Sequence, residues 1–160
     1  MKKSEEGCII RVCSSSIALQ QLLKKANEIN KGENIVQLFD KEHVINKIHL
    51  LGAYVDTMEA FRNKTNIAKS PALELLLYVA MTRQISDAIK TVGAKSNKSF
   101  VLFCNNKEAY MMVKRLVKNE KEFDPKKSDS VKIAKKFGIT QANDLNQFIL
   151  QKMALSRIED

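Results

Sequence analysis

The apolar segment 72–81 constrains the fold of this chain most, because only Glu74 interrupts a run of apolar and aromatic residues. Ser70 is the predicted N-cap of a helix here, and Pro71 suits the first helical position, where the missing N–H costs nothing. A helix without a broad polar face has to be buried among other elements. We therefore expect the rest of the chain to pack around this helix.

Glu74 is the one carboxylate in this run, and two roles are open to it. It either satisfies nearby backbone or basic groups, or it takes a direct part in chemistry. We favour the structural role, because a lone buried carboxylate needs partners to stay charged. On this interpretation Glu74 anchors, from beneath, the backbone of the preceding loop or a cation of the flanking segments.

A polar break at residues 82–84 separates this helix from a second one. Behind the break, apolar residues recur at the i, i+3, i+4 and i+7 positions typical of an amphipathic helix: Ile85, Ala88, Ile89 and Val92. Gly93 is predicted to end this helix in the left-handed conformation of a C′ residue.

Basic and amide side chains stand on both sides of the apolar helix. Arg83 and Gln84, at the start of the second helix, can bind an anion together with the free N–H groups there. The alternative is that they are solvated turn residues, and Lys64 and Lys69 have the same two interpretations. Aromatic residues are scarce near the break, so a general platform for stacking single-stranded bases has weak support.

Length and charge set the broad class. The 160 residues are enough for one domain with its own core, and we expect a single domain over residues 1–160. The net charge of +9, from 27 Lys and Arg against 18 Asp and Glu, favours a polyanionic partner such as nucleic acid without proving one.

The three cysteines lie in apolar runs and lack the spacing of a metal site or a redox motif: Cys8, Cys13 and Cys104. We expect them to be small core residues of a protein in a reducing compartment. No signal peptide or membrane span is recognisable, so we expect a soluble, cytoplasmic protein.

The remaining chain alternates short apolar runs with amphipathic segments. Strands are predicted at 7–13, 34–39 and 100–104, with extended residues at 43–45. Helices are predicted after a cap in Ser14–Ser16 as far as 29, and at 50–62, 107–118, 129–137 and 143–157, with an exposed loop at 119–130. This pattern predicts an α/β (α+β) fold, with a small mixed or antiparallel sheet of about three or four strands covered by about six or seven helices. The strand order stays open.

The last predicted helix carries apolar side chains almost all round its surface. A terminal helix cannot easily bury every side within its own small domain, so we expect part of it to face a partner. The residues that we assign to this contact are Phe148, Ile149, Met153 and Leu155.

No residue pattern nominates a catalyst. The chain has five glycines and no glycine-rich phosphate loop. His43 and His49 are its only histidines, and their spacing does not fit a zinc site. We expect no enzymatic activity, no metal and no cofactor.

Residues 37–94 resemble the small subunit of the archaeal and eukaryotic KEOPS complex that binds the Bud/PRPK-type kinase, the PRPK-binding protein family. The residues that carry the resemblance are QLFD at 37–40, His49-Leu50, Ala60-Phe61, Asn66-Ile67-Ala68 with Ser70, Glu74 with LLLY at 75–78, RQI at 83–85 with Ala88-Ile89, and Gly93. The helix sequence LNQFILQKMAL also has a counterpart in that family. Each fragment is short, and their order and spacing give the resemblance its specificity.

The resemblance implies a subunit that does not catalyse. Such a subunit binds the N-terminal lobe of the kinase-like subunit at one end of a linear complex, and through it joins the remaining KEOPS subunits. It helps to bring tRNA to the machinery that makes threonylcarbamoyladenosine, and it contacts the single-stranded 3′ CCA end. The alternative is a protein-only adaptor that regulates the kinase, with a basic charge that merely keeps the chain soluble.

Carried over residue by residue, the resemblance implies RNA contact at Lys64, Asn66, Lys69, Ser70, Arg83, Gln84 and Ile85. The cations would meet phosphates, the amides would meet base edges, and Ile85 would form a wall of the pocket. The chain departs from the family at Met81, where relatives usually have glycine. The contact residues of the last helix would then bind the kinase.

Overall fold

The computed structural model describes residues 7–158, and these group into two compact units, each built from two stretches of the chain. The first, which we call the sheet unit, joins the segment that ends at Lys41 to Gly93–Phe123. The second, the helical unit, joins Glu42–Val92 to the segment that begins at Asp124. The expectation of one domain over residues 1–160 stays a prediction.

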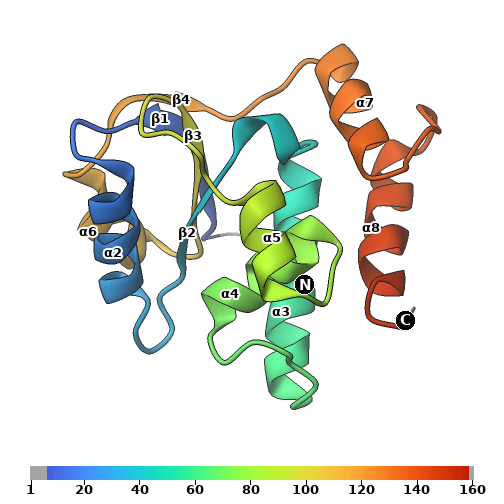
Figure 1. The fold of residues 1–160 in the computed structure, drawn as a ribbon, viewed down its shortest axis with the longest axis horizontal. Coiled ribbons are helices and arrows are strands. Elements are labelled where there is room, and N and C mark those ends of the chain that lie inside the picture. Colours follow the sequence, from blue (N-terminus) through green and yellow to red (C-terminus); the bar gives the residue numbers. More distant parts are fainter. Residues whose placement is uncertain (1–6, 159–160) are drawn as a thin grey trace. The chain divides into compact units, whose positions relative to one another are not determined.

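The sheet unit contains a four-stranded antiparallel sheet in the order β2-β3-β1-β4 (Figure 1). Its elements are β1 (Ile9–Ser14), α2 (Leu19–Ile29), β2 (Val36–Phe39), β3 (Phe100–Cys104), α6 (Lys107–Lys114) and β4 (Lys118–Glu122). The central strand β3 is buried along its whole length, as a continuous apolar run predicts. The predicted α+β class and sheet are confirmed.

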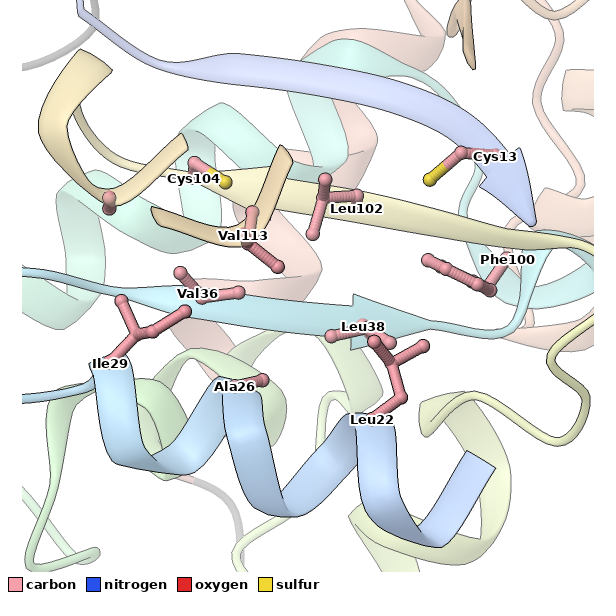
Figure 2. Close-up of a cluster of buried hydrophobic side chains, with 11 residues drawn as sticks. Cys13, Leu22, Ala26, Ile29, Val36, Leu38, Phe100, Leu102, Cys104 and Val113 are labelled. Carbon is pink, nitrogen blue, oxygen red and sulfur yellow. The ribbon is translucent and has the colours of Figure 1, made fainter. Parts of the chain in front are cut away.

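The core of the sheet unit lies between the sheet and the two helices α2 and α6 (Figure 2). Leu22, Ala26 and Ile29 follow helical spacing along α2, and they face Val36 and Leu38 of β2. Alternate β3 residues complete this layer, because successive side chains of a strand point to opposite faces: Phe100, Leu102 and Cys104.

Two local predictions in this unit are wrong. Residues 119–122 belong to β4 and not to a loop, and α6 ends at Lys114, before the predicted boundary. β4 is an exposed edge strand of charged and amide residues, so it lacks the apolar alternation that would reveal it; charged residues are common on sheet edges. α2 begins at Leu19 without a side-chain cap, because its N-cap residue is Ala18, which lies beyond the predicted serines. The Ser15 hydroxyl instead donates to the Leu116 carbonyl at 2.6 Å.

The helical unit contains five α-helices within the described residues. They are α3 (Lys47–Arg62), α4 (Pro71–Ala80), α5 (Ile85–Val92), α7 (Lys127–Lys136) and α8 (Leu145–Leu155) (Figure 1). α3 begins earlier than predicted because Asn46 caps it, accepting from the His49 N–H at 3.0 Å. His43 ends a 3-10 helix, Lys41–His43, so extended backbone was wrongly predicted there.

α3 packs against both α4 and α8. Gly52, in the middle of α3, makes the second contact close: a Cβ at this position would lie 2.4 Å from Leu150 Cδ2 and 3.1 Å from Met153 Cε. Gly52 therefore leaves room for the side chains of Leu150 and Met153 of α8. Gly93 behaves differently from its prediction, because it forms an antiparallel bridge with Phe39, whereas the described glycines with left-handed backbone are Gly32 and Gly138.

His49 is a buried structural histidine of α3. Its Nε2 lies 2.8 Å from the Val79 carbonyl oxygen, its Nδ1 accepts from the Ile45 N–H at 3.1 Å, and its ring meets Phe137 edge-on. Burial lowers the pKa of His49 to about 4, so the ring is neutral at physiological pH.

Cys13 and Cys104 are buried free thiols, as predicted, and Cys8 is half-buried. Within residues 7–158, no group of three or more His, Cys, Asp or Glu side chains is arranged to hold a metal ion. None of the described helices has the length and apolar character needed to cross a bilayer.

Candidate functional site

α4 is built as the sequence predicts. The Ser70 hydroxyl accepts from the Leu73 N–H at 3.3 Å, and Pro71 is the first helical residue. The helix ends at Ala80, and Met81 follows in left-handed conformation with φ 56° and ψ 44°. The Thr82 N–H then reaches back to the Leu77 carbonyl, which is the bond pattern of a helix end closed by a left-handed residue.

Glu74 is fully buried and holds the backbone of the loop before α4, residues 63–70, which we call the α3–α4 loop. Its Oε2 accepts from the N–H groups of Ile67 at 2.9 Å and Ala68 at 2.8 Å. Its Oε1 pairs with Nη2 of Arg157, in the turn after α8. The interpretation of Glu74 as an anchor of the loop is therefore confirmed, and its cation comes from the far end of the chain.

Arg157 belongs to this buried network, although no motif in the sequence points to it. Its guanidinium carbon lies 3.9 Å from the centroid of the Tyr78 ring, so the cation stacks on α4 while it pairs with Glu74. Asp56 of α3 also feels this charge: burial and the nearby Glu59 raise the pKa of Asp56 to about 6, and Arg157 opposes that rise. The sequence gives one signal for Arg157, because a lone cation follows an apolar helix. It does not indicate which residue this cation pairs with.

The predicted RNA-contact residues fall into two groups at the two ends of α4. Lys64, Asn66, Lys69 and Ser70 belong to the α3–α4 loop, and Arg83, Gln84 and Ile85 follow the left-handed turn at Met81. α4 has ten residues, so it separates the groups by about 15 Å of helix. The two groups thus precede and follow one helix, and their joint contact with RNA stays a prediction.

The side chains in these groups differ in exposure. Lys64, Lys69, Arg83 and Gln84 are exposed. Asn66, Ser70 and Ile85 are half-buried. Two of these half-buried side chains make local hydrogen bonds: Asn66 Nδ2 donates to the Ala68 carbonyl at 2.8 Å, and the Ser70 hydroxyl caps α4.

The predicted kinase-contact residues divide between the inside and the surface of α8. Ile149 and Met153 are 0% exposed, so they hold α8 in the helical unit and are not part of its surface. Phe148 and Leu155 are 36% and 47% exposed, and both line a hollow of about 280 Å³. The other residues around this hollow are Gly138, Ile139, Thr140, Gln141, Gln151 and Lys152. Ile149 and Met153 therefore offer no exposed surface to a partner in this structure, which a helical wheel does not reveal, and the kinase contact itself stays a prediction.

The amino-acid sequence of the chain matches a known protein family over most of its length. The family described as "Kinase binding protein CGI-121" matches residues 12–157, which include the α3–α4 loop, α4, α8 and Arg157. The chain belongs to this family. The comparison with curated proteins found no match.

Membership of the CGI-121 family confirms the resemblance stated from the motifs between residues 37 and 94. The match extends well beyond those motifs at both ends, from the last residues of β1 through the whole of α8. In this CGI-121 chain, the motif residue Glu74 proves to be the centre of a buried network, whereas Arg83 and Gln84 of the RQI motif are exposed.

Proposed function

We propose that the chain is a non-catalytic accessory subunit of the KEOPS complex, which binds the kinase-like subunit and the 3′ CCA end of tRNA. On this proposal it serves threonylcarbamoyladenosine modification of tRNA, in the cytoplasm and without a cofactor. The observation that carries the proposal is the CGI-121 family match over residues 12–157. That family is described as kinase-binding, and the chain has an apolar surface to offer a protein partner.

The outer face of α8 supports the kinase contact. We define this face as Phe148, Gln151, Lys152 and Leu155, the α8 residues that line the hollow. Large apolar side chains in a concave site rimmed by amides and a lysine have the composition of a protein interface. The kinase-like subunit would place an apolar side chain in the hollow.

A charge placed on this face tests the kinase contact. Leu155→Glu should weaken binding of the purified kinase-like subunit at least about tenfold, since a charge buried in an interface costs a few kcal/mol. Gln147→Glu, which adds the same charge at an exposed position of α8, should bind as the unmodified chain does. Equal affinity of both variants in calorimetry would remove α8 from the proposed interface. Ile149→Glu is unsuitable, because it would bury a charge in the core.

The exposed cations around α4 support the RNA contact. Lys64 and Lys69 stand on one side, and Arg83 stands on the other, beside the N-terminus of α5. Backbone N–H groups and a nearby arginine suit a phosphate. A single-stranded RNA end that runs along α4 can engage both groups, because such binding follows the backbone over several nucleotides.

Reversal of one charge tests the RNA contact. Arg83→Glu should weaken binding of a tRNA with an intact CCA end, and it should reduce the slope of log affinity against log salt by about one for each phosphate that the chain no longer neutralises. Arg115→Glu changes the charge equally at an exposed arginine of the sheet unit and serves as the control. The RNA assignment is wrong if the two variants have the same affinity and the same salt slope.

The protein-only adaptor remains the second candidate, and one observation favours it. The side chains of Asn66 and Ser70 already hydrogen-bond within their own loop, which leaves fewer groups to meet base edges. An adaptor of this kind would bind the kinase-like subunit as tightly as proposed and would not distinguish a tRNA with its CCA end from one without it.

A further inference from the structure

A continuous series of contacts in the helical unit leads from the outer face of α8 to the α3–α4 loop. Leu155, which lines the hollow, is followed by a turn held by bonds from the Arg157 N–H to the Ala154 carbonyl at 3.3 Å and from the Ile158 N–H to the Leu155 carbonyl at 3.0 Å. Arg157 in this turn pairs with Glu74. The series ends at the α3–α4 loop, since Glu74 accepts from two of its amides.

Glu74 has hydrogen-bond partners on both of its carboxylate oxygens. Its two oxygens share three donors, one cationic and two from the backbone. Arg157 is held less completely, because its Nε and Nη1 are buried without a hydrogen-bond partner among the described residues. Buried donors without acceptors are costly. The desolvation cost of these two nitrogens therefore opposes the favourable pairing of Arg157 with Glu74. The pair therefore depends on where the turn after α8 holds the guanidinium of Arg157.

We propose that Arg157 is a positioning residue that couples the two surfaces, so that a partner bound on the outer face of α8 tightens RNA binding at the α3–α4 loop. This inference rests on the proposed function, because it joins the proposed kinase surface to the proposed RNA surface. The partner fixes Leu155 and the turn, the turn fixes the guanidinium between Glu74 and Tyr78, and Glu74 then holds the loop amides of Ile67 and Ala68.

The sign of the coupling follows from the loop. A loop that is already ordered loses less conformational freedom when RNA binds, so any contact that orders it raises RNA affinity. Lys64 and Lys69, the exposed cations proposed to meet RNA, belong to this loop. By reciprocity, RNA must raise the affinity for the partner on α8 by the same factor. We expect a factor of at least about five, within the usual range for coupled sites.

Binding measurements on the full chain test the coupling. The probe is a short RNA hairpin with a single-stranded CCA end, and its affinity is measured with and without a saturating amount of the kinase-like subunit. The unmodified chain should gain at least about fivefold, and the Arg115→Gln control should gain the same. Arg157→Gln should reduce the gain to less than about twofold, and Arg157→Lys, which keeps the charge, should restore part of it. A gain that Arg157→Gln leaves intact overturns the proposal.

Amide hydrogen exchange gives a second test that needs no variant. The N–H groups of Ile67 and Ala68 report directly on the loop, because both donate to Glu74. Addition of the kinase-like subunit to the unmodified chain should slow their exchange at least about fivefold. The Leu73 N–H, which donates to the Ser70 hydroxyl, serves as the internal reference and should change less. Unchanged exchange at both loop amides overturns the proposal, even if Arg157→Gln fails to fold.

The two experiments separate this inference from the proposed function. A chain that does not distinguish the CCA hairpin from a hairpin without CCA refutes the proposed RNA contact, while slower exchange at Ile67 and Ala68 still supports a link from α8 to the loop. A chain that binds both the hairpin and the kinase-like subunit, with independent affinities and unchanged exchange, leaves the proposed function in place and refutes the coupling.

Discussion

The left-handed turn at Met81 leads to a sharp stability prediction. A residue with a Cβ loses about 1–2 kcal/mol in this conformation, and glycine pays about 0.5–1 kcal/mol for its greater freedom in the unfolded chain. Met81 has φ 56°, so Met81→Gly should be more stable than Met81→Ala by about 1 kcal/mol. Comparison with alanine is essential, because both variants lose the same half-buried side chain beyond Cβ.

Urea unfolding followed by circular dichroism measures this difference. With a slope of about 2 kcal/mol per molar urea, 1 kcal/mol moves the midpoint by about 0.5 M. Ala80, one residue earlier, is the last residue of α4, and Ala80→Gly should lower stability by up to about 1 kcal/mol. The order of glycine and alanine should therefore reverse between adjacent positions. Equal or lower stability of Met81→Gly relative to Met81→Ala would refute the argument from backbone strain.

Three further predictions concern buried groups. Glu74→Gln leaves Arg157 buried without its charge partner and should lower the free energy of unfolding by about 3–5 kcal/mol. The double variant Glu74→Gln/Arg157→Met should lose less, because it removes the unpaired charge and its amide oxygen can still accept from the loop N–H groups. The pKa of His49 is about 4 in the folded chain against 6.5 in the unfolded one, so the unfolded state binds more protons between these values. His49 should thus lower the free energy of unfolding by up to about 3 kcal/mol as pH falls from about 6.5 to 4. The raised pKa of Asp56 acts in the opposite sense, because the folded state then binds more protons than the unfolded state. Burial raises the pKa of Cys104, so this thiol should not react with a disulfide reagent at pH 8 until urea unfolds the chain.

Each of these predictions has a direct check. Urea unfolding of the two Glu74 variants decides the first, and a double variant less stable than Glu74→Gln would contradict it. For the second, His49→Gln should lose less stability than the unmodified chain between pH 6.5 and 4, and parallel pH profiles would count against it. For the third, mass spectrometry of the labelled chain would show modification of folded Cys104 if the thiol were accessible.

The sequence predicts α4 well because its signals are local. Ser70, Pro71 and the apolar run stand next to one another, and each acts within one turn of helix. β4 shows the opposite case, since an edge strand that is solvent-exposed has no apolar alternation, and only its pairing with β1 defines it.

The candidate site is only half predictable for a similar reason. The motifs indicate which cations lie near α4 in the sequence. Where these cations lie in space depends on the fold of the chain on either side of the helix. Arg157 pairs with a residue 83 positions earlier, and nothing local to either residue indicates the other. On α8, the helical pattern names the apolar residues, and only packing against α3 decides that Ile149 and Met153 face inward.

The central claim is that this CGI-121 family member binds the CCA end of tRNA as well as a kinase-like partner. The most direct test measures the affinity of the full chain for one tRNA prepared with and without its three terminal nucleotides, at a single stated salt concentration, because the ionic part of RNA binding depends on salt. We predict that removal of CCA weakens binding at least about tenfold, about 1.4 kcal/mol, since it would remove phosphate contacts with the exposed cations and base-edge contacts with the amides. Equal affinity for the two tRNAs would contradict the account and leave the protein-only adaptor.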